Sequence, residues 1–345
     1  MANVLMTEGF DMYNGTGPNT GMNARWSFNV RDTPSFMTTG RFGGQAWETS
    51  NTVPGGGTPF QAWRVFDPAS AATSIAFGAA INCGSVGTSG GLLVEIQNGS
   101  LGVLCSIGFT TAGAIYADSG SGGTRLCTSA TGLLTAATWH YLEAELVLHA
   151  SAGSVNIYLN GALIASASGV NTLSAGGAGS VIKLWGTTAN ASLLYDDIYI
   201  VSGATRLGEC KVETLRPTGD SAVTWTPSSG TANYSCVNET LVDGNTSFVQ
   251  TATTGQGDLY AIGALSSTPQ NIYAVNVVSF AEKTDATTRQ LYNSVKSGTT
   301  VSDGAAANLA ASYGRYDRIL NTDPATSAAW TPSGVNNLLI GPKAA

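Results

Sequence analysis

The sequence predicts an all-β protein with two domains, and three observations support this prediction. The chain has 345 residues, of which 43 are Gly, 43% are hydrophobic and only 11% are charged, so it can bury one or two sizeable cores. Short runs rich in Val, Ile, Tyr and Thr are separated by Gly, Ser, Asn and Pro, and long helix-forming runs are not seen. The composition changes near residue 206, which predicts domains at residues 1–205 and 206–345.

In the first domain, the expected strands follow one another at about the 8 to 12-residue spacing of a β-sandwich. The opening strand contains Glu8-Gly9-Phe10-Asp11. Later strands are expected at residues 63–66, 74–81, 92–96, 101–105, 113–116, 180–185 and 192–200. Asn98-Gly99 lies between two of these strands and predicts a hairpin turn.

The most informative local pattern is a pair of alternating runs at residues 138–148 and 155–159. Trp139 and Tyr141 lead the first run, and a short link that contains Gly153 joins it to the second. The second run ends in Asn160-Gly161, a pair that favours a tight two-residue turn. These residues therefore predict a β-hairpin followed by a further chain reversal.

This Trp-led hairpin resembles the back-sheet hairpin of laminin-G-like, concanavalin-type jelly rolls. The opening strand around Glu8-Gly9-Phe10-Asp11 resembles the first strand of that class, whose two ends pair in one sheet. Asp196-Asp197-Ile198-Tyr199 resembles its closing strand. The resemblance implies a laminin-G-like jelly-roll sandwich over residues 1–205, and a binding or structural module more than an enzyme.

The second domain is predicted to be a smaller β-sandwich, with strands at residues 258–262, 272–280, 288–295 and 313–320. Its ordered motifs resemble those of a family of structural proteins of tailed bacteriophages. The motifs are Val212-Glu213-Thr214-Leu215-Arg216-Pro217, Ala222-Val223-Thr224-Trp225-Thr226-Pro227, Lys283-Thr284-Asp285-Ala286, residues 322–331 and Val335-Asn336-Asn337-Leu338.

The phage resemblance implies a non-enzymatic virion protein that acts as a capsid decoration, head fibre or tail fibre. Its expected partners are other virion proteins and further copies of itself, with a trimer as the favoured oligomer. The segment Met1–Phe10 lacks the basic start and the apolar stretch of a secretory signal, so synthesis in the bacterial host cytoplasm is expected. The net charge of -7 argues against nucleic-acid binding, and no apolar run is long enough to predict a membrane span.

An adhesin that recognises host-surface glycans is the alternative function. Exposed aromatic rings can stack on the apolar face of a sugar while Asn and Asp bind its hydroxyls. The candidate rings are those of Trp26, Trp47, Trp63, Trp185 and Trp225, although most are expected in the core. A third hypothesis is a glycan-cleaving enzyme from the glucanase branch of the same fold.

The candidate catalytic carboxylates are Glu143 and Glu145, which lie two residues apart on one strand and so point to the same face. A solvated strand face is the favoured explanation for this pair. His140 and His149 lie in or beside the same strand, but no Gly-x-Ser-x-Gly motif accompanies them. No catalytic residue is therefore assigned.

Asp196 and Asp197 are the best candidates for a metal site, because laminin-G-like domains often hold Ca²⁺ with carboxylate and carbonyl oxygens. The two residues match the closing strand of that class and not its calcium loop. A structural role, such as capping a strand or pairing with an Arg, is favoured. No cofactor is assigned, and Ca²⁺ is the one ion that the resemblance leaves open.

The five cysteines show neither a Cys-x-x-Cys pair nor His residues at zinc-ligand spacing. They are Cys83, Cys105, Cys127, Cys210 and Cys236. The favoured interpretation is small buried hydrophobic residues. The equal spacing of the first three could instead place them on adjacent strands, and the odd number leaves one thiol for a disulfide between subunits, formed outside the reducing cytoplasm.

Overall fold

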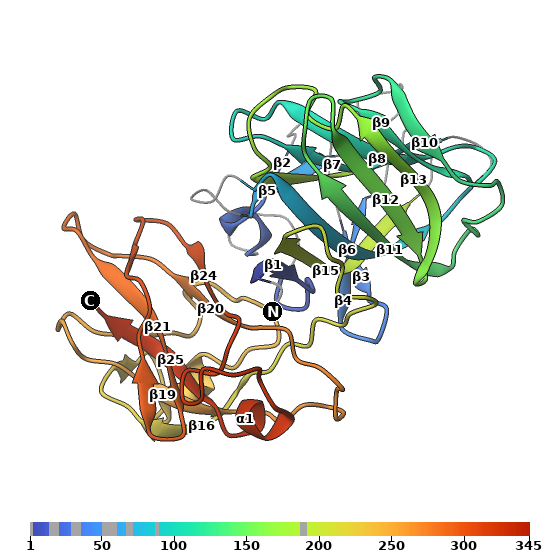
Figure 1. Cartoon of the computed structure of the whole chain (residues 1–345). Helices are drawn as coiled ribbons and strands as arrows, with labels where there is room; N and C mark the ends of the chain where they lie inside the picture. The colour runs from blue at the N-terminus through green and yellow to red at the C-terminus, as the bar shows by residue number, and fades with distance from the viewer. Residues whose placement is uncertain are drawn as a thin grey trace. The chain divides into compact units, whose positions relative to one another are not determined.

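The protein folds into two units, which Figure 1 shows in a computed structural model. The structure describes residues 3–13, 21–28, 36–49, 61–66, 72–86, 90–186 and 192–345. The first unit comprises Met1–Phe10 and Trp26–Val212, and the second comprises Asp11–Arg25 and Glu213–Ala345. The division therefore differs from the expected one, because the first unit continues to Val212 and an early segment joins the second unit.

The first unit is an antiparallel sandwich of two sheets, as the sequence predicted. In spatial order, the strands of sheet A are β13 (Ala162–Val170), β12 (Gly153–Leu159), β11 (Trp139–Val147), β6 (Ser74–Cys83), β15 (Leu193–Ser202), β4 (Gln45–Thr49) and β3 (Phe36–Thr39), with β1 (Asn3–Glu8) also beside β15. Those of sheet B are β10 (Arg125–Thr128), β9 (Ile115–Ser119), β8 (Val103–Phe109), β7 (Gly91–Gln97), β14 (Val181–Trp185), β5 (Gln61–Val65) and β2 (Ser27–Phe28).

The two ends of the first unit pair in one sheet, which confirms the expectation for a jelly roll. β1 runs antiparallel to β15, with Thr7 opposite Tyr199 and Glu8 opposite Ile198. The other half of the same edge of β15 pairs with β4. Register shifts between Asp196 and Tyr199, where Asp197 has a positive φ of 51°. This bulge separates the part of β15 that pairs with β4 from the part that pairs with β1.

The Trp-led hairpin is also confirmed. β11 and β12 pair in register from Leu142 opposite Leu159 to Val147 opposite Ser154. Asn160 and Gly161 then turn the chain into β13 with φ values of 49° and 82°, the left-handed pair that a type I′ turn requires. Asn98-Gly99 likewise lies in the connection of an antiparallel pair, β7 and β8, but the positive φ there belongs to Leu101.

Among the described residues, aromatic rings and an ion pair lie between the two sheets. Trp47 lies 5.7 Å from Tyr195 and 6.3 Å from Phe10 between ring centroids. Arg64 of sheet B donates to Glu8 of sheet A over 2.8 Å, and the two side chains are 1% and 0% exposed. Trp26 Nε1 donates to the same carboxylate over 3.0 Å. The opening strand is therefore tied to the opposite sheet.

The first unit ends with a segment, Gly203–Val212, that follows the outer face of sheet A and is called the strap below. Its backbone amides donate to side chains of the sheet: Leu207 to the hydroxyl of Tyr199 over 2.9 Å, and Gly208 to Glu143 over 2.9 Å. Val212 donates to Asp197 over 2.7 Å. These bonds explain why the unit does not end at residue 205.

The second unit contains a six-stranded sheet and two small ladders in the part that the structure describes. The sheet order is β16 (Pro217–Ala222), β19 (Leu259–Ile262), β25 (Leu339–Ala344), β21 (Gln290–Ser297) and β22 (Thr300–Ser302), with β23 (Ala307–Asn308) also paired to β21. The ladders are β17 (Thr226–Pro227) with β18 (Val249–Gln250), and β20 (Val275–Ala281) with β24 (Gly314–Leu320). The helices are α1 (Pro332–Asn336) and the 3₁₀ turns η1 (Met22–Ala24) and η2 (Asn233–Cys236).

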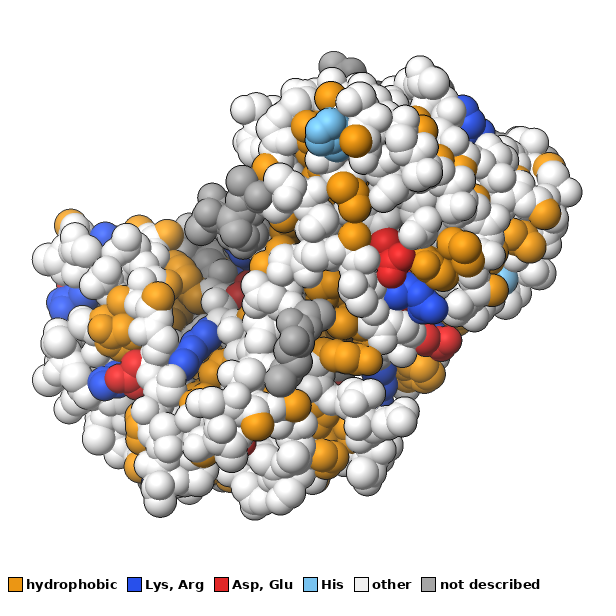
Figure 2. Space-filling view, viewed as in Figure 1, with side chains coloured by type: hydrophobic (Ala, Val, Ile, Leu, Met, Phe, Trp, Pro, Cys, Tyr) orange, Lys and Arg blue, Asp and Glu red, His pale blue; other side chains and the backbone are white. Residues whose placement is uncertain are grey.

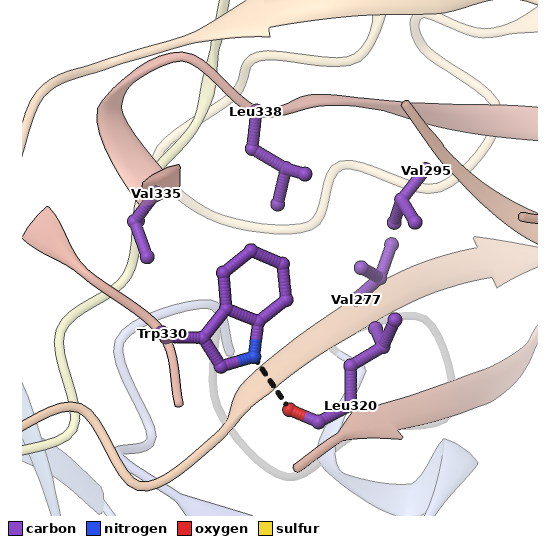
Figure 3. Packing of buried hydrophobic residues seen from close by; sticks show 6 residues of the cluster. All are labelled: Val277, Val295, Leu320, Trp330, Val335 and Leu338. Carbon is purple, nitrogen blue, oxygen red and sulfur yellow. Dashed lines mark hydrogen bonds between the residues drawn. The ribbon is translucent and has the colours of Figure 1, made fainter. Parts of the chain in front are cut away.

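Trp330 lies at the centre of the core of the second unit (Figure 3). Its ring is 4% exposed, and its Nε1 donates to the carbonyl of Leu320 over 2.9 Å. The other buried members of this cluster are Val277, Val295, Leu320, Val335 and Leu338. They come from β20, β21 and β24, from α1 and from the residue just before β25, so the β20–β24 ladder packs over the six-stranded sheet.

His140, near the start of β11, provides a pH test of the hairpin. The residue is 7% exposed, its Nε2 accepts from the amide of Thr135 over 3.2 Å, and burial lowers the pKa of the imidazole below 6.5. Because the folded pKa is lower than the unfolded one, unfolding takes up a proton as the pH falls below 6.5, and stability falls with it. We expect His140→Gln to flatten the decline in melting temperature below pH 6.5. An equal slope in wild type and His140→Gln would contradict this expectation.

Candidate functional site

One lateral row of side chains crosses sheet B. Its members occupy directly opposed positions on neighbouring antiparallel strands, so they share one face of the sheet. In order from β5 to β10, they are Trp63, Lys183, Glu95, Ser106, Asp118 and Arg125. Five strand spacings of about 4.8 Å make the row about 24 Å long.

This row lies on the outward face of sheet B. The residues that alternate with it include Val94, Ile96, Ile182 and Leu184, each at most 1% exposed. Successive side chains of a strand point to opposite faces, so these apolar residues face the core and the row faces away from it. Trp63, Lys183 and Arg125 of the row are partly exposed on this face, whereas Glu95, Ser106 and Asp118 are buried beneath it.

Glu95, Lys183 and Trp185 form one end of the polar part of the row. Lys183 Nζ lies 3.6 Å from Glu95 Oε2 and 4.2 Å above the centre of the Trp185 ring. Gln97 Nε2 donates to the same Oε2 over 3.0 Å, whereas Glu95 Oε1 and Trp185 Nε1 are buried without a hydrogen-bond partner. Desolvation lowers the pKa of Lys183, and the nearby carboxylate opposes that shift. This end thus holds one buried acceptor and one buried donor that lack partners.

Asp118, Arg125 and Tyr116 form the other end. Arg125 Nε donates to Asp118 over 2.5 Å, and its guanidinium lies 3.4 Å from the centre of the Tyr116 ring. Ser106 lies between the two ends, and its hydroxyl donates to the carbonyl of Gly120 over 2.7 Å. Burial raises the pKa of Tyr116, so its hydroxyl remains protonated at neutral pH. The two ends repeat one arrangement, a carboxylate beside a cation that covers an aromatic ring.

Three rings on this face are half-buried, namely Trp63, Trp185 and Tyr116, so part of each ring is exposed. By contrast, Trp26 and Trp47 are core residues with 2% and 0% exposure, so two of the five candidate rings lie in the core, and the expectation that most do is wrong. Trp225 lies in the second unit, where its Nε1 donates to Gln256 over 3.0 Å. The structure thus places two of the five candidate tryptophans, Trp63 and Trp185, on one face.

The charged residues of the row were not among the candidates taken from the sequence. Glu95 lies in a run of apolar residues, and Lys183, Asp118 and Arg125 come from three other strands. Only strand register brings them together, and register depends on contacts between distant parts of the chain. The one local signal is the alternation of Glu95 and Gln97 with buried Val94 and Ile96.

Glu143 and Glu145 share one face of sheet A as predicted, but the favoured explanation of a solvated face is wrong for Glu143. This side chain is 0% exposed and accepts from Tyr199 Oη over 2.6 Å and from Arg206 Nη1 over 2.7 Å, besides the strap amide of Gly208. Glu145 accepts from Tyr158 Oη over 2.9 Å. Both carboxylates hold the strap and the adjacent strand in place, which is a structural task.

Asp196 and Asp197 have structural partners. Asp196 accepts from the amide of Arg41 over 2.9 Å, and its other oxygen accepts from the amide of Asp197 over 2.8 Å. Asp197 accepts from the amide of Val212 and lies 3.7 Å from Arg41 Nη1. No group of three or more His, Cys, Asp and Glu side chains suitable for a metal ion occurs in the described ranges.

All five cysteines are free thiols in the chain: Cys83, Cys105 and Cys236 are buried, whereas Cys127 and Cys210 are half-buried. The proposal that equal spacing places three of them on adjacent strands is wrong. Cys83 lies on β6 of sheet A, and Cys105 and Cys127 lie on β8 and β10 of sheet B, with β9 between them. Burial raises the pKa of the Cys83, Cys105 and Cys210 thiols to about 12.

Figure 2 shows few charged side chains among the described residues of this face. The blue and red side chains lie singly or in small mixed groups. The view shows no continuous basic patch among them. No helix in the described part of the chain is long and apolar enough to cross a membrane.

Comparison with known proteins gives similarity of structure only, since no family model and no curated protein matches the sequence. The matching solved structures include an endo-β-1,4-glucuronan lyase from the fungus Trichoderma reesei, at 12% identity and a TM-score of 0.34 over 53% of this chain and 92% of that one. A carbohydrate esterase from the Shiga toxin-encoding bacteriophage phi24B matches at 13% identity and a TM-score of 0.43, over 59% of this chain and all of that one.

The carbohydrate-binding module CBM66 from Bacillus subtilis is a third similar structure, at 12% identity and a TM-score of 0.35 over 55% of this chain and 99% of that one. These three proteins comprise two enzymes and one binding module. At such low TM-scores, they carry no argument about the function of this chain.

Proposed function

We propose that the first unit binds a carbohydrate on the outward face of sheet B. The observation that carries this proposal is the row from Trp63 to Arg125, in which half-buried aromatic rings lie beside carboxylates and cations. Proteins bind sugars through aromatic rings that contact C–H faces and through hydrogen bonds to hydroxyl groups, and this face has side chains for both.

The rings of Trp63, Trp185 and Tyr116 supply flat apolar surface for the C–H faces of a sugar. Glu95 and Asp118 accept hydrogen bonds from hydroxyl groups, and Lys183 and Arg125 donate to them. Because the strands fix the backbone of all these residues, little conformational entropy remains to be lost on binding. A rigid sheet face of this kind suits a binding module.

The test uses the full chain on a glycan array, followed by titration calorimetry with the best ligand. We expect Trp63→Ala and Trp185→Ala each to weaken binding by at least about tenfold, which corresponds to about 1.4 kcal/mol. Phe42→Ala is the control, because Phe42 is 57% exposed and lies on the β3–β4 hairpin of the other sheet. A dark array, or an equal loss in the control, would contradict the proposed site.

For the whole chain, the proposed setting is the virion of a tailed bacteriophage, where the protein acts without catalysis as a capsid decoration, head fibre or tail fibre. The phage-like motif series of residues 212–338 supports this setting. Apart from Val212, its residues belong to the second unit: Trp330 and Leu338 lie in the core, and Thr331 caps α1 through a hydrogen bond from Gly334. The partners would be other virion proteins and further copies of this chain, with a trimer as the expected oligomer.

Glu143 and Glu145 accept hydrogen bonds from the strap, which supports a function in which these two carboxylates are not catalytic. Electron cryomicroscopy of particles from the source tests the setting. Density of this chain on the capsid lattice would favour a decoration or head fibre, and density at the tail would favour a receptor-binding fibre. Particles without the chain would refute a virion role and leave the glycan proposal to its own test.

A further inference from the structure

We infer that the ligand of this face is a neutral oligosaccharide, and that Glu95 and Asp118 exclude uronate and sulfated sugars. The inference rests on the proposed glycan-binding function and names the class of sugar. It follows from the order of charges along the row, from how those charges are paired and from the polar atoms left without partners.

The two carboxylates occupy the middle of the row and the two cations its flanks. Glu95, Ser106 and Asp118 are 0%, 0% and 3% exposed. The side chains of Lys183 and Arg125 are 15% and 44% exposed. The charges nearest the middle of the row are therefore negative, and they lie deep in the face, where little water remains to screen them.

Both cations are already neutralised by the carboxylates. Lys183 pairs with Glu95, and Arg125 donates to Asp118 and also, over 3.3 Å, to the hydroxyl of Thr128. The one other charged residue on the described strands of sheet B is Arg64, which faces the core and pairs with Glu8. The described strands of sheet B thus supply this face with no surplus positive charge to compensate an anionic ligand.

Two buried polar atoms beside Lys183 have no hydrogen-bond partner. Glu95 Oε1 is an acceptor and Trp185 Nε1 is a donor, and both are buried without a hydrogen-bond partner. A sugar hydroxyl both donates and accepts, so neighbouring hydroxyls can satisfy both atoms. A ligand carboxylate or sulfate could accept from Trp185 but would face Glu95 as a like charge. Neutral hydroxyl groups are therefore the chemistry that this site fits.

The experiment titrates the full chain with two matched sets of probes at low and high NaCl. The neutral set is cellohexaose, mannohexaose, xylohexaose and N-acetylchitohexaose, and the anionic set is hexamers of mannuronate, galacturonate and chondroitin sulfate. We expect binding from the neutral set alone, with an affinity that NaCl does not change. Glu95→Gln keeps the size of the side chain and removes its charge, so the bound neutral probe should bind about tenfold more weakly.

Asp118→Asn and Glu95→Gln together should also permit measurable binding of an anionic probe. The control is Glu48→Gln, which removes a half-buried carboxylate from β4 of sheet A. This variant should bind the neutral probe as tightly as the wild type and should still not bind the anionic probes. A melting curve of each variant separates loss of binding from loss of folding. Tighter binding of anionic than of neutral probes would overturn the inference and leave the glycan-binding function standing. Failure of both sets, together with a dark array, would overturn both.

Discussion

Replacing Glu8 by Ala is expected to lower the free energy of unfolding by about 3–5 kcal/mol, the usual cost of removing one member of a buried ion pair. Glu8 is 1% exposed and accepts hydrogen bonds from Arg64 and Trp26. Its removal leaves the guanidinium of Arg64 between the two sheets with the backbone carbonyl of Thr7, 3.4 Å away, as a remaining acceptor. Chemical denaturation of the full chain measures the change.

The control for this prediction is a double variant, Glu8→Leu with Arg64→Met. Removing both charges and keeping apolar volume is often neutral or stabilising, because neither charge then has to be desolvated. We therefore expect the double variant to recover most of the stability lost in Glu8→Ala. If it is as unstable as the single variant, the loss comes from packing around Trp26 and not from breaking the ion pair.

Trp330→Ala is expected to destabilise the second unit by about 3–5 kcal/mol, the range for removing a large aromatic ring from a core. The ring contacts residues from both layers of the unit, and its Nε1 satisfies the carbonyl of Leu320. Scanning calorimetry would show a lower melting temperature for the transition that includes this unit. A change below about 1 kcal/mol would mean that the cluster collapses around the missing ring.

Trp330→Phe separates the two contributions of this residue. Phe keeps much of the ring in the core but cannot donate to Leu320, so its cost should be about 1–3 kcal/mol, the penalty for a buried acceptor left without a partner. Because this variant differs from Trp330→Ala mainly in volume, the difference between them measures packing.

The sequence predicted the elements whose signals are local. The alternation after Trp139 and the Asn160-Gly161 pair specified a hairpin and a turn, because strand periodicity and left-handed backbone conformations depend on neighbouring residues. The strand predictions for residues 74–81 and 92–96 also correspond to β6 and β7. By contrast, β25 was missed, since Pro342 lacks an amide proton and usually argues against a central strand.

In β25, the carbonyl of Pro342 accepts from the amide of Asp258 over 2.9 Å, so the strand joins its neighbours in spite of the proline. The binding face was not predicted for a different reason. Glu95 and Asp118 belong to strands separated by β8, and only the pairing register shows that they share a row. The burial of Glu143 was also not predictable from its own strand, because the strap that covers it comes from residues 203–212.

The assignment of Asp11–Arg25 to the second unit has a consequence for how the protein can be cut. The chain passes between the units after Phe10, after Arg25 and after Val212. Tyr13 receives a hydrogen bond from Arg315, and the carbonyl of Met12 accepts from Val242 over 2.9 Å. A protease that cleaves only after Val212 would therefore leave the amino-terminal fragment anchored in the second unit. The two fragments should migrate together in a native gel and part only in denaturant, so a single cleavage site between the units would not release either one.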